Sequence, residues 1–98
     1  LAEIPQGSIQ LDEGACIAVR DHGASILPVG ITATTGEYNA GDVINVVGPD
    51  GALIGRGVAR YSSTEMSRVR GLRLDVVRRF LPEKAGVPAI HRDELLVF

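Results

Sequence analysis

The sequence is poor in cysteine and lacks long apolar runs. Cys16 is its one cysteine, so no internal disulfide can form, and the reducing cytoplasm is the compartment that fits best. No apolar run approaches the ~18 residues that a membrane span requires. The first ten residues also lack the basic start and apolar stretch of a signal peptide. These absences predict a cytoplasmic protein with no membrane partner.

Lysine, aromatic residues and histidine are also scarce. Lys84 is the only lysine and lies between Glu83 and Ala85, which excludes a phosphate-binding loop with its Gly-Lys-Ser/Thr pattern. Aromatic residues make up 4% of the chain, so bases would find few side chains to stack on. His22 and His91 lie far apart without companion ligands at metal-binding spacing. We therefore expect no metal site and no nucleotide cofactor in this chain.

The formal net charge of −2 conceals two parts of opposite sign. Residues 1–55 carry a charge of −6, and residues 56–98 carry +4. Such a split is typical either of a polyanion-binding face, or of two halves that attract each other inside one fold or arginines that are simply solvated. Attraction or solvation is favoured over polyanion binding. Four late arginines are nonetheless the candidate basic strip: Arg56, Arg60, Arg68 and Arg70.

The first half of the chain predicts one helix between short strands. Ile9 and Leu11 alternate with a polar residue, as in a strand. Asp12 suits a helix N-cap and Gly23 a helix stop, so we expect a helix over 12–22 with Ala15, Ala18, Val19 and His22 on one face. Residues 25–31 are expected to be extended, with the proline at a sheet edge or bend. Strands are expected over 32–35 and 43–47.

The second half predicts a hairpin, two short helices and closing strand segments. Residues 48–51 (Gly-Pro-Asp-Gly) form a strong turn signal leading into a returning strand over 52–61. One face of that strand is expected to carry Leu53, Gly55, Gly57, Ala59 and Tyr61, and the other Ile54, Arg56, Val58 and Arg60. The small residues of the first face would let another backbone approach closely. Ser62 and Glu65 have capping-box spacing, and a second helix is expected over about 74–81. The fold class is thus mostly β with short helices: a small barrel of mixed strands, one early helix and two short late helices.

No residue pattern indicates a catalytic centre. Cys16 is interpreted as a small buried side chain, and Ser62 and Ser63 as capping residues without a neighbouring base. In His91-Arg92-Asp93, adjacent residues on an extended segment would face opposite ways. We therefore expect this triplet to fix the final strand by hydrogen bonds instead of forming a proton relay.

Three motifs are specific when taken together. They are the segment 25–31 (Ser-Ile-Leu-Pro-Val-Gly-Ile), the triplet Tyr61-Ser62-Ser63, and the closing Ile90-His91-Arg92-Asp93. As a set they resemble the PUA domain family, and most closely the PUA domain at the C-terminus of bacterial glutamate 5-kinases. The resemblance covers about residues 6–98.

The resemblance implies a PUA-like pseudo-barrel and a noncatalytic accessory role. Residues 1–98 would be a single PUA domain, with 1–5 as the linker from an amino-acid kinase domain upstream. The parent enzyme would use ATP and Mg in that upstream domain to phosphorylate the γ-carboxylate of glutamate, the first step of proline biosynthesis. This chain would have no kinase activity of its own. It would serve regulation or assembly of a homo-oligomeric parent.

An alternative is the RNA-binding PUA module of an RNA-modifying enzyme. In such modules RNA lies in a groove beside the first helix and the strand after it. The matching positions here are Arg20, Gly23, Ser25, Leu27, Pro28 and Gly30. Ala24 and Asn39-Ala40 stand where basic residues are common in the family. Their absence makes RNA the less favoured partner.

Overall fold

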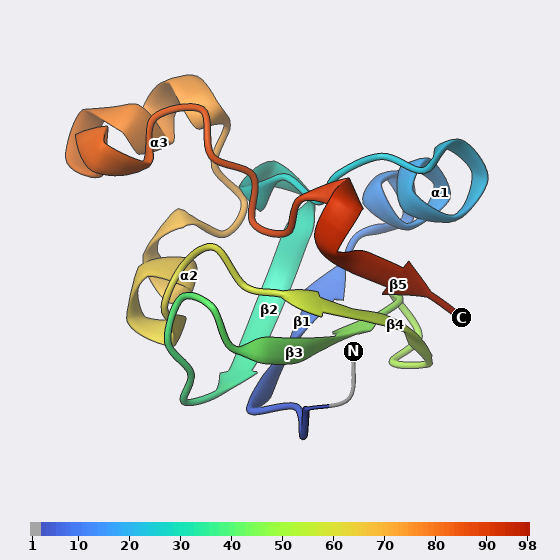
Figure 1. The fold of residues 1–98 in the computed structure, drawn as a ribbon. Coiled ribbons are helices and arrows are strands. Elements are labelled where there is room, and N and C mark those ends of the chain that lie inside the picture. Colours follow the sequence, from blue (N-terminus) through green and yellow to red (C-terminus); the bar gives the residue numbers. More distant parts are fainter. Residues whose placement is uncertain (1–2) are drawn as a thin grey trace.

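The computed structural model describes residues 3–98, and Figure 1 shows its elements in chain order. The strands are β1 (Gly7–Leu11), β2 (Ile31–Gly36), β3 (Val43–Val47), β4 (Leu53–Val58) and β5 (Leu95–Val97). The helices are α1 (Glu13–His22), α2 (Ser63–Val69) and α3 (Leu74–Phe80). The predicted fold class is confirmed. The linker predicted over 1–5 lies partly outside the described residues, and residues 3–5 form neither helix nor strand.

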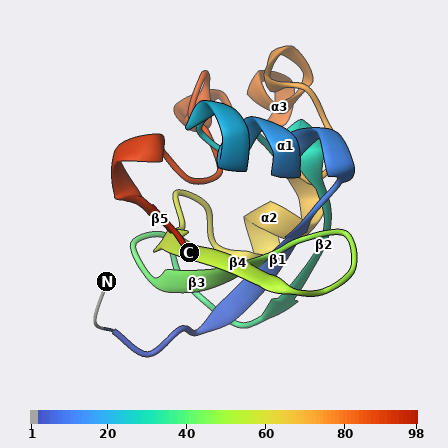
Figure 2. The same cartoon turned by 90° about the vertical axis from the view of Figure 1, so that its right-hand side faces the viewer.

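The five strands form one mixed sheet in the order β2-β1-β3-β4-β5. β1 runs parallel to β3, and every other neighbouring pair is antiparallel. A bridge between Ile26 and Ile90 joins the segment before β2 to the segment before β5, although these strands are the two ends of the order. The sheet is therefore partly closed on itself. Both views show α1 and α3 above it (Figures 1 and 2).

Local signals at the ends of α1 act as the sequence predicts. The Asp12 side chain accepts a hydrogen bond from the Ala15 N–H at 2.7 Å, and Gly23 takes the left-handed conformation with φ 62°. The inward face differs in part from the prediction, since Ala15 and Ala18 are only half-buried. Cys16 and Val19 are buried, whereas His22 is exposed, because the last turn of the helix extends beyond the core. Cys16 is confirmed as a small buried side chain.

The segment 25–31 is not extended throughout, so that prediction is wrong in part. Pro28–Gly30 form a turn of 3-10 helix, in which the Gly30 N–H donates to the Leu27 carbonyl at 3.1 Å. Pro28 is buried and begins this turn, so of the two predicted places, sheet edge or bend, it occupies a bend. Proline suits the first helical position because its φ is preset and its missing N–H would be unbonded there.

The returning strand is shorter than predicted, and its faces are partly exchanged. Gly55, Gly57 and Ala59 face inward as expected, but Leu53 is exposed and Ile54 is buried. The register shifts between Val46 and Val47 on the partner strand, and a bulge of this kind reverses the side-chain order beyond it. The expected hairpin turn over 48–51 is present, with the Gly48 N–H donating to the Ala52 carbonyl at 2.9 Å.

The two late helices cover the core with few side chains. Ser62 and Glu65 form the full capping box at the start of α2. Met66 and Val69 from α2 and Val77 from α3 are completely buried. They meet side chains from every part of the sheet in a single cluster, whose fully buried members include Ile9, Leu11, Ile44, Val46, Tyr61 and Ile90.

The close approach of β4 to the C-terminal segment yields a stability prediction. A Cβ at Gly55 would lie 2.5 Å from the Leu96 carbonyl oxygen, which is backbone and cannot rotate away. We expect Gly55→Ala to lower the free energy of unfolding by about 1–3 kcal/mol, measured by urea denaturation. Gly14→Ala in α1 is the control, because its Cβ would meet nothing closer than 3.6 Å. That control should be neutral or slightly stabilising. Equal stability of the two variants would contradict the close-packing explanation.

Candidate functional site

The groove predicted beside the first helix begins at a tight junction. The Asp12 N–H donates to the Gly30 carbonyl at 2.8 Å, which ties the start of α1 to the turn before β2. A Cβ at Gly30 would overlap the Cβ of Ala15. Helix and turn are therefore in contact here, and Gly30 serves that contact with no space left for a ligand between them.

A second part of the predicted groove meets the C-terminal segment. The Ser25 hydroxyl accepts a hydrogen bond from the Arg92 N–H at 2.9 Å. The Ile26 N–H donates to the Ile90 carbonyl at 2.9 Å, next to it. The structure thus places the Ser25 region beside the closing motif.

The six predicted groove positions do not form one continuous lining. Pro28 and Gly30 are buried, while Gly23 and Leu27 are exposed. Arg20 lies on the other side of α1, where it lines a separate hollow. The groove as a ligand site remains a prediction.

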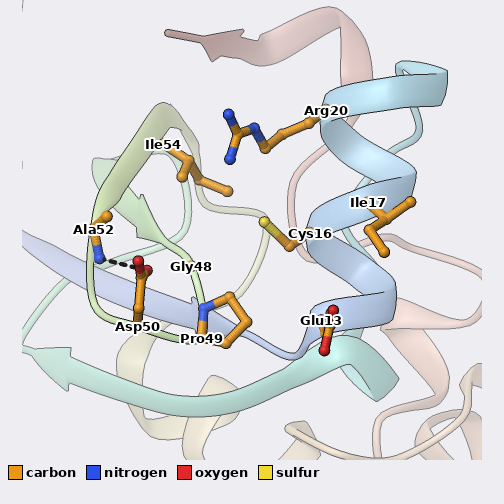
Figure 3. A pocket seen from close by; sticks show the side chains of 9 residues that line it. All are labelled: Glu13, Cys16, Ile17, Arg20, Gly48, Pro49, Asp50, Ala52 and Ile54. Carbon is orange, nitrogen blue, oxygen red and sulfur yellow. Dashed lines mark hydrogen bonds between the residues drawn. The ribbon is translucent and has the colours of Figure 1, made fainter.

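The hollow that Arg20 lines lies between α1 and the β3–β4 turn (Figure 3). Its volume is about 370 Å³. The Cys16 side chain points into it from the helix, opposite Ile54 on β4. The lining is mainly apolar with charged groups at its edge, and consists of Glu13, Cys16, Ile17, Arg20, Gly48, Pro49, Asp50, Ala52 and Ile54.

Sequence reasoning did not find this hollow. It found the 48–51 turn and the buried Cys16 as separate features. Which helix face lies across from a turn depends on tertiary packing, and no local signal records it. Within residues 3–98 no group of three potential metal ligands occurs, here or elsewhere.

The motif Tyr61-Ser62-Ser63 is occupied by structural hydrogen bonds. The Tyr61 hydroxyl donates to the Val87 carbonyl at 2.7 Å, and its ring is fully buried. The Ser62 hydroxyl caps α2. The Ser63 hydroxyl accepts from the Tyr38 N–H at 3.2 Å. None of the three side chains is arranged as a nucleophile.

The triplet His91-Arg92-Asp93 also makes local contacts, but its backbone is not extended. Arg92–Glu94 form a 3-10 turn, in which His91 Nδ1 accepts from the Asp93 N–H at 3.1 Å. Nδ1 also lies 3.5 Å from the Asp93 carboxylate. The premise that these side chains face opposite ways on a strand is therefore wrong. The hydrogen bonds still hold the segment that leads into β5.

The arginines of the candidate basic strip have separate environments. The Arg56 Nε donates to Asn45 at 3.0 Å, and its guanidinium lies 5.8 Å from the Phe98 ring centre. Arg60 forms an ion pair with Glu94 at 2.6 Å. Arg68 lies over Phe80, and Arg70 donates to the Thr32 carbonyl on β2. Arg56 is paired with β5 and Arg70 with β2, which are opposite ends of the strand order.

The PUA domain family matches residues 7–81, which is most of the chain and includes β1 to α3. The chain belongs to the PUA domain family. The mixed sheet with its early helix and late helices agrees with that assignment.

Among its relatives, the PUA chain is similar to part of a glutamate 5-kinase from a Synechococcus strain. The two are 41% identical over 94% of this chain and 25% of the relative, so this chain spans about a quarter of the relative's length. Two solved structures share the fold. A PUA domain from Aeropyrum pernix, in a tartrate complex, has TM-score 0.66 and 25% identity over 89% of this chain and 41% of that one. The archaeal box H/ACA sRNP Nop10–Cbf5 complex has TM-score 0.57 and 28% identity over 62% of this chain and 19% of that one.

In the part of the chain that the structure describes, no helix combines the length and apolar character needed to cross a bilayer.

The buried tyrosines predict a loss of stability at alkaline pH. Burial raises the pKa of Tyr61, and the nearby Glu65 carboxylate raises it further. Burial also raises the pKa of Tyr38, against a smaller opposite effect of the Thr34 hydrogen bond. Tyrosine in the unfolded chain ionises at pH ~10. Above that pH the unfolded state loses its tyrosine protons before the folded state does, so the free energy of unfolding falls. The stabilisation is complete below the unfolded pKa and is lost as pH rises through the folded one.

The measurement is urea denaturation at about pH 8 and about pH 10.5. At the lower pH, Tyr61→Phe should lower the free energy of unfolding by about 1–2 kcal/mol, because the carbonyl of the half-buried Val87 loses its partner. Between the two pH values, the free energy of unfolding of Tyr61→Phe should fall by less than that of the unmodified protein, since one titrating group is gone. An equal alkaline loss would show that Tyr61 does not contribute to it.

Proposed function

We propose that this chain is the noncatalytic accessory PUA domain of a glutamate 5-kinase. The single observation that carries the proposal is its 41% identity to a glutamate 5-kinase over 94% of its own length. The parent would transfer the ATP γ-phosphate to the γ-carboxylate of glutamate in an amino-acid kinase domain upstream of residue 1. ATP and Mg would be bound there, in the cytoplasm, and the parent would be a homo-oligomer.

The hydrogen bonding of the shared motifs supports a role without chemistry. Tyr61, Ser62 and Ser63 are engaged by the backbone or by a helix end. Ser25 and His91 accept hydrogen bonds from the turn before β5. Residues that make such hydrogen bonds stabilise the domain, and a stable domain can contact its neighbours in the parent enzyme. Regulation and assembly are the functions that such a domain can perform.

The RNA-binding module of an RNA-modifying enzyme is the second candidate. Likeness to a structure described as an archaeal box H/ACA sRNP complex favours it. Against it, Gly30 and Pro28 are buried, and Arg20 lies away from the remaining groove positions. The groove also lacks added positive charge at Ala24. The accessory domain of a kinase therefore remains the better-supported proposal.

A domain exchange tests the proposal. Three proteins are compared: the Synechococcus glutamate 5-kinase, the same enzyme without the quarter that matches this chain, and a chimera carrying this chain in that place. We expect all three to form γ-glutamyl phosphate, because the reacting groups would lie in the other domain. The truncated enzyme should differ from the full enzyme in end-product inhibition or oligomeric size, and the chimera should restore the behaviour of the full enzyme.

The readouts are steady-state kinetics, inhibition curves and light scattering. A chimera that folds but behaves like the truncated enzyme would contradict the accessory role. The coding sequence before residue 1 provides an independent check. An amino-acid kinase domain is expected there, and an RNA-modifying domain would overturn the proposal.

A further inference from the structure

Apolar side chains are exposed together where β4 and β5 run side by side. Four of them form what we call the terminal patch: Leu53, Leu96, Val97 and Phe98. Their exposed fractions range from 38% for Val97 to 59% for Phe98. The Phe98 N–H donates to the Ile54 carbonyl at 2.9 Å, which brings residue 98 close to Leu53. Single exposed apolar residues are common, whereas a group of them is typical of an interaction surface.

The terminal patch borders the hollow between α1 and the β3–β4 turn. Ile54, whose carbonyl accepts from Phe98, is also part of the lining of that hollow. Figure 2 shows the end of β5, α1 and the β3–β4 turn on the face turned toward the viewer. Ile17, another exposed apolar residue, lines the hollow from α1. The apolar surface therefore continues from the patch into a concave part that can receive a side chain of a partner.

The strand that carries most of the patch has an open edge. β5 is the last strand in the sheet order, and no described strand pairs with its outer side. Natural proteins protect such edges with charged residues or proline, or cover them with another segment. Residues 95–98 are Leu-Leu-Val-Phe and contain neither a charge nor a proline. This edge is thus of the kind that a partner covers.

A cation without a carboxylate partner lies within the patch. Arg56 is opposite Leu96 in the β4–β5 register, and its guanidinium lies 5.8 Å from the Phe98 ring centre. Among the described residues, all ion pairs lie within 56–98 and none includes Arg56: Arg60–Glu94, Arg73–Asp75 and His91–Asp93. The attraction expected between the acidic and basic parts of the chain is therefore not made by direct ion pairs. Arg56 is available to a carboxylate of a partner.

We propose that the terminal patch is the docking surface for the domain that precedes residue 1 in the same polypeptide. The face that docks would be apolar, with a carboxylate opposite Arg56. The inference rests on the proposed function, in which the larger part of the parent lies upstream because this chain spans 25% of the length of its relative.

The connection to the upstream domain favours this occupant. The Gln6 N–H donates to the Val43 carbonyl at 2.9 Å, and Val43 pairs with Val58 on β4, the strand that also carries Leu53. A six-residue strand such as β4 spans about 20 Å. The linker predicted over 1–5 reaches at most about 18 Å. The upstream domain is therefore held near the patch.

A short linker also favours docking energetically. Two modules joined by a short flexible linker meet at an effective concentration in the millimolar range. A small apolar interface can therefore remain closed within one polypeptide. A second copy of this chain lacks that advantage, so it is the less favoured occupant.

The test is hydroxyl-radical footprinting of two proteins, the 98-residue chain and the full-length parent with its own upstream domain. Mass spectrometry gives the oxidation rate of each side chain, which follows its exposure to solvent. Phe98 should be oxidised at least about threefold more slowly in the parent, because the centre of an interface is largely closed to water. Phe80 on α3 is the matched control, since it is the same residue type and is 40% exposed outside the patch. Its oxidation rate should be the same in both proteins.

Three results would overturn the proposal. One is an equal oxidation rate of Phe98 in the two proteins. Another is equal protection of Phe98 and Phe80 in the parent, because the effect would then not belong to the patch. The third is protection of Phe98 in the 98-residue chain as its concentration rises, together with a dimer mass by light scattering. In that case the occupant would be a second copy.

A pair of variants in the parent provides a second test. Phe98→Asp would place a carboxylate in the apolar contact, where its desolvation is costly, and would compete with the partner for Arg56. The oxidation rates of Leu53 and Leu96 should then rise to those of the 98-residue chain. Phe80→Asp makes the same change outside the patch and should leave both residues protected. Protection of Leu53 and Leu96 retained in a Phe98→Asp variant that circular dichroism shows to be folded would contradict docking at this patch.

A kinase assay of the parent separates this inference from the proposed function. A parent that forms γ-glutamyl phosphate but leaves Phe98 unprotected contradicts the docking surface alone. A parent that protects Phe98 but forms no γ-glutamyl phosphate supports the docking surface and contradicts the proposed function.

Discussion

The fold depends on the close approach of the C-terminal segment to β4. Gly55 and Gly57 leave room for the backbone of residues 94–97 and for the Ile90 side chain. Once that segment lies on β4, its neighbours can bond across the molecule. Ile26 pairs with Ile90, and the Tyr61 hydroxyl reaches the Val87 carbonyl. The two glycines of β4 therefore permit both the partial closure of the sheet and the burial of Ile90.

The same arrangement engages the most distinctive motifs of the sequence in hydrogen bonds within the fold. Ser25, Tyr61 and His91 belong to three separate motifs, and each makes a hydrogen bond to backbone at a junction of the fold. Within the described residues, no buried side-chain polar atom lacks a partner. These motif residues thus serve the fold of the domain. The surface, where charge is distributed unevenly, is what remains available for partners.

Charge and packing are separated in this molecule. The core contains no buried charged side chain among the described residues, and the arginines lie at its margins. Arg56 and Arg60 are held by the C-terminal segment, whereas Arg78 and Arg79 extend from a helix that stands off the sheet. Arg56 and Arg60 are therefore fixed at the sheet, and Arg78 and Arg79 are not.

The sequence by itself determined the elements whose signals are local. Asp12, Gly23 and the Ser62–Glu65 box specify helix ends, since capping needs only residues a few positions apart. Tertiary structure alone decided the exchange of Leu53 and Ile54, which follows from a bulge opposite Val47. It also decided the turn at Pro28–Gly30 and the hollow between α1 and the 48–51 turn. These features arise where segments distant in sequence meet, and no local spacing encodes such a meeting.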